Sequence, residues 1–143
     1  MKTNLYWIFV LICFNFFSCG HEDSPVPDLW VDFQVNINNA EFAPLQNPGG
    51  WVYVSGGYNG IFLYNFDNQT YYAYDRACTA DITHAPLVYD EKRHELHHAD
   101  TLENCNSRYS VLLHGAVTYG DAKYPLREYQ VVTYGNKLRV MAE

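Results

Sequence analysis

Short runs of alternating apolar and polar residues dominate the chain and predict an all-β domain. One run covers residues 30–36, and further runs of strand type follow at 51–55, 61–66 and 70–74. Turn signals rich in Gly, Pro, Asn and Asp separate these runs, which is typical of antiparallel strands. The pattern returns near the other end of the chain, at residues 109–113, 116–119, 127–134 and 137–141. The last two runs meet at Tyr134-Gly135-Asn136, which predicts a tight hairpin.

The size and charge of the chain argue against two classes of protein, nucleic-acid-binding proteins and multidomain enzymes. Its 143 residues carry nine Lys plus Arg against sixteen Asp plus Glu, a formal net charge of -7. No run of basic residues is present that could neutralise a phosphate backbone, so nucleic acid is not an expected partner. The length suits one globular domain and excludes a multidomain enzyme.

Residues 1–18 predict a secretion signal. Lys2 is the only charged residue before Glu22, and the apolar run of 13 residues at 5–17 is too short to span a bilayer. The following Ser18-Cys19 resembles the lipobox of bacterial lipoproteins, in which the Cys becomes the lipidated first residue of the mature chain. An ordinary signal peptide with an incidental Cys19 is the alternative.

The lipobox resemblance implies a membrane-anchored protein. Residues 19–28 would form a lipidated, Pro-bearing tether with nothing to bury, and residues 29–143 the folded domain. The acidic pair Glu22-Asp23 is similar to the surface-export signals of Bacteroidetes lipoproteins. We therefore expect an outer-membrane lipoprotein that is either periplasmic or surface-exposed. With Cys13 removed and Cys19 lipidated, Cys78 and Cys105 remain as a disulfide candidate in an oxidising compartment.

The segment His94-Glu95-Leu96-His97-His98 matches the H-E-x-x-H pattern of zinc hydrolases. On a helix, His94 and His98 would share a face and bind zinc, while Glu95 would act as base. The segment lies between strands in a small β-rich domain, and its apolar residues make a weak helical stripe. A chance match in a His-rich stretch is therefore the favoured interpretation.

Three segments, 75–80, 105–110 and 120–131, together resemble a Rieske domain. In that family a C-x-H loop and a C-x-x-H-G-S-x-F loop each supply one Cys and one His to a [2Fe-2S] cluster, and a G-P-A-x-x-P-L-x-x-Y-x-V segment follows. That last pattern matches in register at Gly120, Ala122, Pro125, Leu126, Tyr129 and Val131. Segments 48–54, 60–61 and 72–78 also resemble Rieske-like lipoproteins of Bacteroidetes. The resemblance implies an all-β fold, a Rieske-like antiparallel β sandwich or barrel with an inserted two-loop tip subdomain.

The cluster-ligand positions differ from those of the family. Cys78 stands at the first Cys position, but Ala80 replaces the following His. Aligning residues 107–109 on S-x-F puts Leu102 at the second Cys position and Cys105 at the second His position. A Rieske cluster needs two Cys on one iron and two His on the other. His84 could supply a nitrogen only if its loop were rebuilt, so we expect no cofactor and no metal.

The resemblance also implies how the region between the two ligand loops is folded. It places residues 87–90 and 95–99 as a hairpin that turns at 91–93. It brings Cys78 and Cys105 around one small site, which implies a disulfide with Cα atoms 5 to 6 Å apart. Two buried thiols are the alternative.

Together these observations predict a lipoprotein with a Rieske-like domain that has lost its cluster and has a binding or structural role in the cell envelope. It is not expected to be an enzyme. Its expected partners are the membrane, through the lipid, and an unidentified envelope protein or glycan. A [2Fe-2S] electron-transfer protein with unusual ligands and a zinc hydrolase using residues 94–98 are the alternatives.

Overall fold

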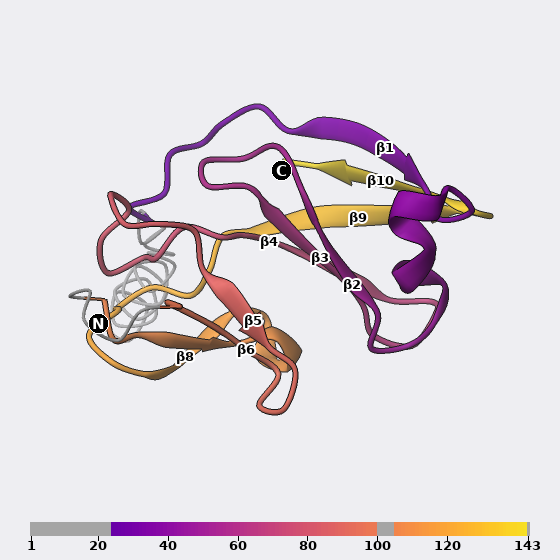
Figure 1. Ribbon diagram of the computed structural model, residues 1–143. Helices are drawn as coiled ribbons and strands as arrows, with labels where there is room; N and C mark the ends of the chain where they lie inside the picture. Colours follow the sequence, from indigo (N-terminus) through magenta and orange to yellow (C-terminus); the bar gives the residue numbers. More distant parts are fainter. Residues whose placement is uncertain (1–23, 100–104, 143) are drawn as a thin grey trace, which may run out of the picture.

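The computed structural model describes residues 24–99 and 105–142. The expected signal at 1–18, the lipidation residue Cys19 and Leu102 lie outside the described residues. The described part holds ten strands in two antiparallel sheets, with two short 3-10 helices (Figure 1). Within it, no helix is both long and apolar enough to cross a membrane.

The larger sheet has six strands and forms the body of the domain (Figure 1). In spatial order its strands are β1 (Asp32–Asn36), β10 (Lys137–Met141), β9 (Glu128–Tyr134), β4 (Tyr71–Asp75), β3 (Ile61–Asn65) and β2 (Trp51–Val54). The 3-10 helix η2 (Ala40–Gln46) connects β1 to β2. The expected β9–β10 hairpin is present, with Tyr134 paired to Lys137 across Gly135 and Asn136.

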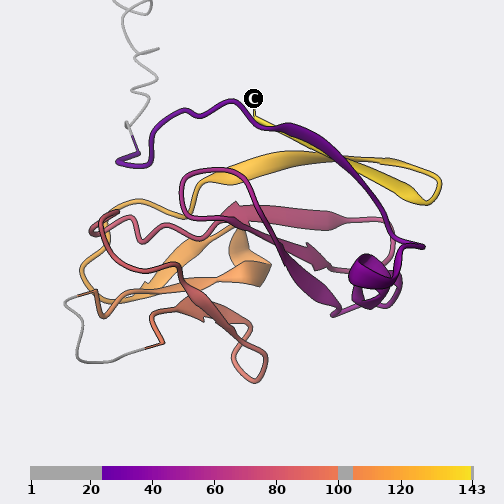
Figure 2. The same cartoon turned by 45° about the horizontal axis from the view of Figure 1, so that its top comes forward.

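The smaller sheet is inserted in the chain between β4 and β9 (Figure 2). Its strands, in order, are β5 (Val88–Asp90), β6 (Glu95–His97), β7 (Arg108–Ser110) and β8 (Ala116–Tyr119). β4 and β9 pair with each other across this insertion. The all-β class, the antiparallel pairing and the inserted subdomain are thus confirmed, as is the β5–β6 hairpin with its turn after Asp90.

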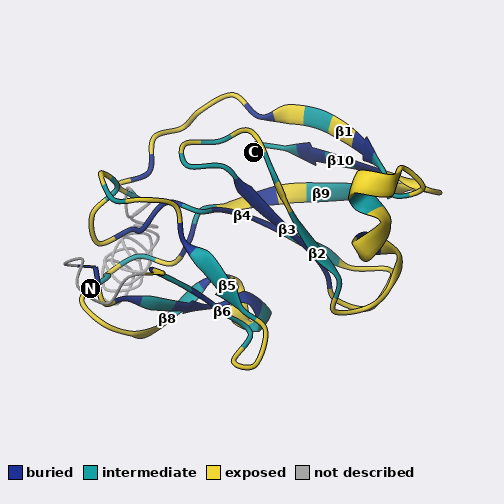
Figure 3. Ribbon diagram, viewed as in Figure 1, coloured by how far each residue is buried: buried dark blue, intermediate teal, exposed yellow. Residues whose placement is uncertain are grey.

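β3 lies between two hydrophobic cores, and all five of its residues are buried (Figure 3). Ile61 and Leu63 belong to a core on one side of the larger sheet, with Val35, Leu45, Ala73, Tyr129, Leu138 and Val140. Because side chains alternate along a strand, Phe62 and Tyr64 face the other side. They belong to the core shared with the smaller sheet. A strand buried on both faces reads as a continuous apolar run, as residues 61–64 do.

Aromatic contacts fix the smaller sheet on the larger one. The Tyr89 ring of β5 lies 4.7 Å from the Phe62 ring of β3 and 5.5 Å from the Trp51 ring of β2, between ring centroids. Trp51 Nε1 donates to Glu91 Oε1 at 2.9 Å, and the Tyr89 backbone N–H donates to the Tyr53 hydroxyl. Burial raises the pKa of Tyr89 above its ordinary value. Offset and edge-on ring pairs contribute favourable free energy beyond the burial of their area. These contacts therefore stabilise the packing of the smaller sheet on the larger one.

Two expectations about local structure were wrong. Residues 109–113 do not form one strand, because β7 ends at Ser110 and the 3-10 helix η3 (Val111–Leu113) follows. The turn buries Val111 and lets the Tyr74 hydroxyl donate to the Val111 carbonyl at 3.0 Å. The tether was expected to bury nothing, yet Val26 is buried and Asp28 pairs with Arg127. The described end of the expected tether therefore contacts the domain at these two residues.

Candidate functional site

Three chain segments meet at the tip of the smaller sheet. The first tip loop, residues 76–87, connects β4 to β5, and the second tip loop, residues 98–107, connects β6 to β7. The closing segment, residues 120–126, follows β8 and contacts both loops. Thr79 Oγ1 of the first loop donates to the Tyr124 carbonyl at 2.5 Å, and the Ala122 N–H donates to Ser107 Oγ of the second loop at 3.0 Å.

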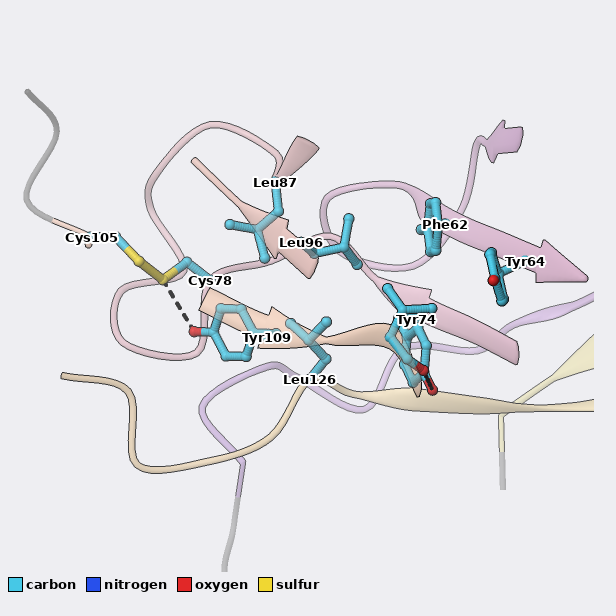
Figure 4. Packing of buried hydrophobic residues seen from close by; sticks show 10 residues of the cluster. Phe62, Tyr64, Tyr74, Cys78, Leu87, Leu96, Cys105, Tyr109 and Leu126 are labelled. Atoms are coloured by element: carbon cyan, nitrogen blue, oxygen red, sulfur yellow. Dashed lines mark hydrogen bonds between the residues drawn. A yellow bond between two sulfur atoms is a disulfide. The ribbon is translucent and has the colours of Figure 1, made fainter. Parts of the chain in front are cut away.

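A disulfide joins the two tip loops between Cys78 and Cys105 (Figure 4). Both cysteines are buried, and they continue the core that runs from Phe62 through Leu96 and Tyr109. The pairing inferred from the resemblance is therefore confirmed. The Cα atoms are 7.1 Å apart, farther than the 5 to 6 Å expected and just beyond the usual range for disulfides.

The Tyr109 hydroxyl lies directly against the disulfide (Figure 4). It is 3.4 Å from Cys78 Sγ and accepts the Thr79 backbone N–H at 3.0 Å. The Thr79 Oγ1 hydrogen is directed to Tyr124, so at the 3.0 Å contact Tyr109 donates to Thr79 Oγ1. This fully buried phenol thereby connects β7 to Cys78 and Thr79 of the first tip loop. Through Thr79 it is also connected to the closing segment.

Histidines from both tip loops lie near the disulfide. One imidazole nitrogen of His98 lies within 4.8 Å of both sulfurs, and the His98 side chain is buried. The His84 ring of the first loop packs edge-on against the His98 ring, with centroids 5.3 Å apart. His84 Nε2 also lies 3.5 Å from Asp81 Oδ2. The tip thus gathers one Cys and one His from each loop.

This donor set does not fit the [2Fe-2S] cluster that the resembled family binds. Such a cluster needs two histidines on the iron opposite the two cysteines. Among the described residues, the convergent donors are Cys78, Cys105 and His98, with a single imidazole, and the two sulfurs are bonded to each other. Ala80, at the expected first His position, is exposed and has no metal-binding atom in its side chain.

The favoured interpretation of residues 94–98, a chance match to H-E-x-x-H, is confirmed, because these residues form a turn and the strand β6 and not the helix that the zinc-hydrolase alternative requires. His94 lies in the turn between β5 and β6 with a φ of 54°, and its Nδ1 is 2.8 Å from the Tyr89 hydroxyl. Glu95 Oε1 accepts the Thr118 hydroxyl. His98 alone reaches the tip, beyond the end of β6. The two imidazoles that would bind zinc are therefore separated, with His94 next to Tyr89 in the β5–β6 turn and His98 next to the disulfide.

Sequence reasoning found the two cysteines but not the place of His98 beside them. The family spacing directs attention to residues two or three positions from each Cys, whereas His98 lies seven positions before Cys105. One signal was available, since the expected hairpin ends where the second tip loop starts. Any polar side chain at the end of the expected strand 95–99, including His98, was a candidate for the tip.

Known structures similar to this chain include a ferredoxin. The chain is similar to the ferredoxin of carbazole 1,9a-dioxygenase from Nocardioides aromaticivorans IC177. The identity is 22% and the TM-score 0.46, over 68% of this chain and 88% of that chain. No family model and no curated protein matches the sequence.

Proposed function

We propose that this protein is a lipid-anchored protein of the cell envelope whose Rieske-like domain is closed at its tip by a disulfide instead of an iron-sulfur cluster. Its role is binding or structural, and it transfers no electrons. The observation that supports the proposal is the buried disulfide between Cys78 and Cys105, which occupies both thiols at the site where a cluster would need them.

The anchor part of the proposal depends on the sequence around Ser18-Cys19. Lipid chains on Cys19 would hold the domain at the outer membrane without a spanning helix. The described part of the tether reaches the domain at Val26 and at the Asp28–Arg127 ion pair. The domain would then stay close to the membrane surface and meet an envelope protein or glycan there.

The cluster-free tip is tested on the exported full chain, purified without reductant. We expect no iron, no acid-labile sulfide and no visible absorption. Two irons and two sulfides per chain, with a coloured protein, would show that the domain is an electron carrier instead.

The anchor is tested separately by cell fractionation. The wild-type protein should be found with membranes, and Cys19→Ala should release it or stop its processing. Cys13→Ala is the matched control, because it removes a cysteine without touching the expected lipidation site or the disulfide. A wild-type protein that is wholly soluble after export would contradict the anchor.

A further inference from the structure

The tip holds three buried donor atoms that lie close to one another. Cys78 Sγ, Cys105 Sγ and one nitrogen of His98 all lie within 4.8 Å of one another. Zinc binds thiolate sulfur at about 2.3 Å and imidazole nitrogen at about 2.0 to 2.1 Å, so two ligands of one zinc are at most about 4.6 Å apart. The bond between the two sulfurs keeps both of them from acting as ligands.

We propose that reduction of the Cys78–Cys105 disulfide converts the tip into a binding site for a single zinc-like divalent cation, held by Cys78, Cys105 and His98. This goes beyond the proposed function, which concerns the oxidised protein. The disulfide and the metal would then be two alternative closures of the same two loops.

Cys78 and His98 are held in place by contacts that do not depend on the disulfide. Next to Cys78, the Ala77 N–H donates to Asp75 Oδ1 at 2.9 Å and the Thr79 N–H donates to the Tyr109 hydroxyl. The His97 ring contacts the His98 carbonyl at 2.6 Å through Nδ1, directly after β6. The pairing of His97 with Arg108 holds the start and the end of the second tip loop side by side. These contacts can therefore keep Cys78, His98 and the two ends of the second tip loop in place after the sulfur–sulfur bond is broken.

The chemistry of this donor set favours zinc. Two thiolates and one imidazole are borderline-soft ligands, and sites with three protein ligands leave a fourth position for water or another donor. His84 supplies a further imidazole close to the site, with its ring 5.3 Å from that of His98. To act as a fourth ligand through Nε2, His84 would have to leave Asp81 Oδ2.

The redox step balances with a dithiol as reductant. Two electrons and two protons pass to the sulfurs, the bond between Cys78 and Cys105 breaks, and the reductant leaves as its own disulfide. Zn²⁺ then replaces the two thiol protons, which are released to solvent. A cavity of about 220 Å³ beside the disulfide, lined by His98, Cys105 and Ser107 among others, gives both reductant and ion a route to the site.

The test uses the full chain, oxidised or reduced with a dithiol and then freed of reductant under anaerobic conditions. Zn²⁺ is titrated against a chromophoric chelator, and Co²⁺ is added separately as a spectroscopic probe. We expect one ion per reduced chain and none per oxidised chain. Bound Co²⁺ should give the charge-transfer band of thiolate ligation and the intense visible bands of a tetrahedral site.

His98→Gln separates this site from simple binding by two thiols. It keeps both cysteines, so its fold can be checked in the oxidised state. Loss of an outer-shell partner already weakens metal binding 10- to 100-fold, so loss of this ligand should weaken it at least tenfold. His114→Asn is the matched control, because His114 is an exposed histidine in a left-handed conformation that Asn tolerates.

Three results would overturn the inference. The first is a reduced wild-type chain that binds no Zn²⁺, whether it stays folded or unfolds and is not refolded by the metal. The second is a His98→Gln variant with wild-type affinity. The third is bound Co²⁺ without thiolate charge transfer. Iron in the oxidised, exported protein would instead contradict the proposed function, so the two failures are distinguishable.

Discussion

Asp75 organises the backbone around the base of the first tip loop. Its buried carboxylate accepts hydrogen bonds from the N–H groups of Tyr58, Asn59 and Ala77 and from the Tyr129 hydroxyl, at 2.6 to 3.1 Å. This arrangement requires glycine at position 57, because a Cβ there would lie 2.3 Å from Asp75 Oδ2. One residue thus connects the β2–β3 turn, the first tip loop and β9.

Asp75→Ala should therefore be strongly destabilising. It leaves three backbone donors and a buried phenol without their acceptor, and each such loss costs about 1 to 3 kcal/mol. We expect the free energy of unfolding to fall by at least roughly 3 kcal/mol, measured in urea. Asp32→Ala is the control, because the Asp32 carboxylate pairs with Arg139 at the surface and exposed pairs contribute about 0 to 1 kcal/mol. Equal losses in the two variants would contradict this role.

At the scale of elements, the closing segment depends on the close approach of Gly120 to the second tip loop. Gly120 has a φ of 95°, and a Cβ there would lie 2.5 Å from the Ser107 Cα. Gly135, in the β9–β10 hairpin, also has a positive φ, but a Cβ there would meet nothing within 4 Å. The same substitution at these two glycines separates backbone strain from steric conflict.

Gly135→Ala should lower the free energy of unfolding by only about 1 to 2 kcal/mol, the cost of a left-handed residue. Gly120→Ala carries a similar cost and must also push the closing segment away from Ser107, which adds about 1 to 3 kcal/mol. Urea unfolding of both variants measures the difference. A Gly120→Ala variant as stable as Gly135→Ala would show that the closing segment is not tightly packed.

The strands could be predicted from the sequence because their signals are local. Alternation and Gly-rich turns mark β2, β8 and β10 to within a residue. The change from β7 to η3 could not be predicted, because it depends on Tyr74, which is distant in sequence and binds the Val111 carbonyl. The site divides in the same way: the cysteine pair followed from the resemblance, whereas the approach of His98 depends on how two hairpin strands end in space.

At the scale of the whole molecule, the disulfide is expected to contribute a large share of the stability. It closes a sequence separation of 27 residues, which on the chain-entropy model stabilises the fold by about 3 to 4 kcal/mol. Domains of this size have total stabilities of about 5 to 15 kcal/mol. Cys105→Ser should lower the melting temperature by roughly 10 to 20 °C, in calorimetry without added metal. A shift of only a few degrees would contradict the estimate.

Alkaline pH should destabilise the fold through tyrosines on both sides of the larger sheet. Burial raises the pKa of Tyr74 and of Tyr129, and the Asp75 carboxylate raises that of Tyr129 further. The unfolded chain releases these protons near pH 10, whereas the folded chain retains them. This contribution to stability is complete below about pH 10 and is lost as the pH rises above it.

Melting curves between pH 8 and pH 11 test this dependence. Tyr129→Phe should start at a lower melting temperature, because it loses its bond to Asp75, but should then decline less steeply with pH than the wild type. Tyr134→Phe, at an exposed hairpin position, serves as the control. If the melting temperatures of the wild type and Tyr129→Phe fall equally steeply with pH, Tyr129 does not contribute to the pH dependence.

The account rests on the state of Cys78 and Cys105 in the protein as it occurs in its cells, and peptide mapping measures it most directly. Cells are quenched with an alkylating agent before lysis, and the purified full chain is digested without reduction and examined by mass spectrometry. We predict one cross-linked species that joins the peptides containing Cys78 and Cys105, with neither residue alkylated. Two alkylated cysteines in the folded protein would contradict the account, because the tip would then be open to a cluster or a metal from the start.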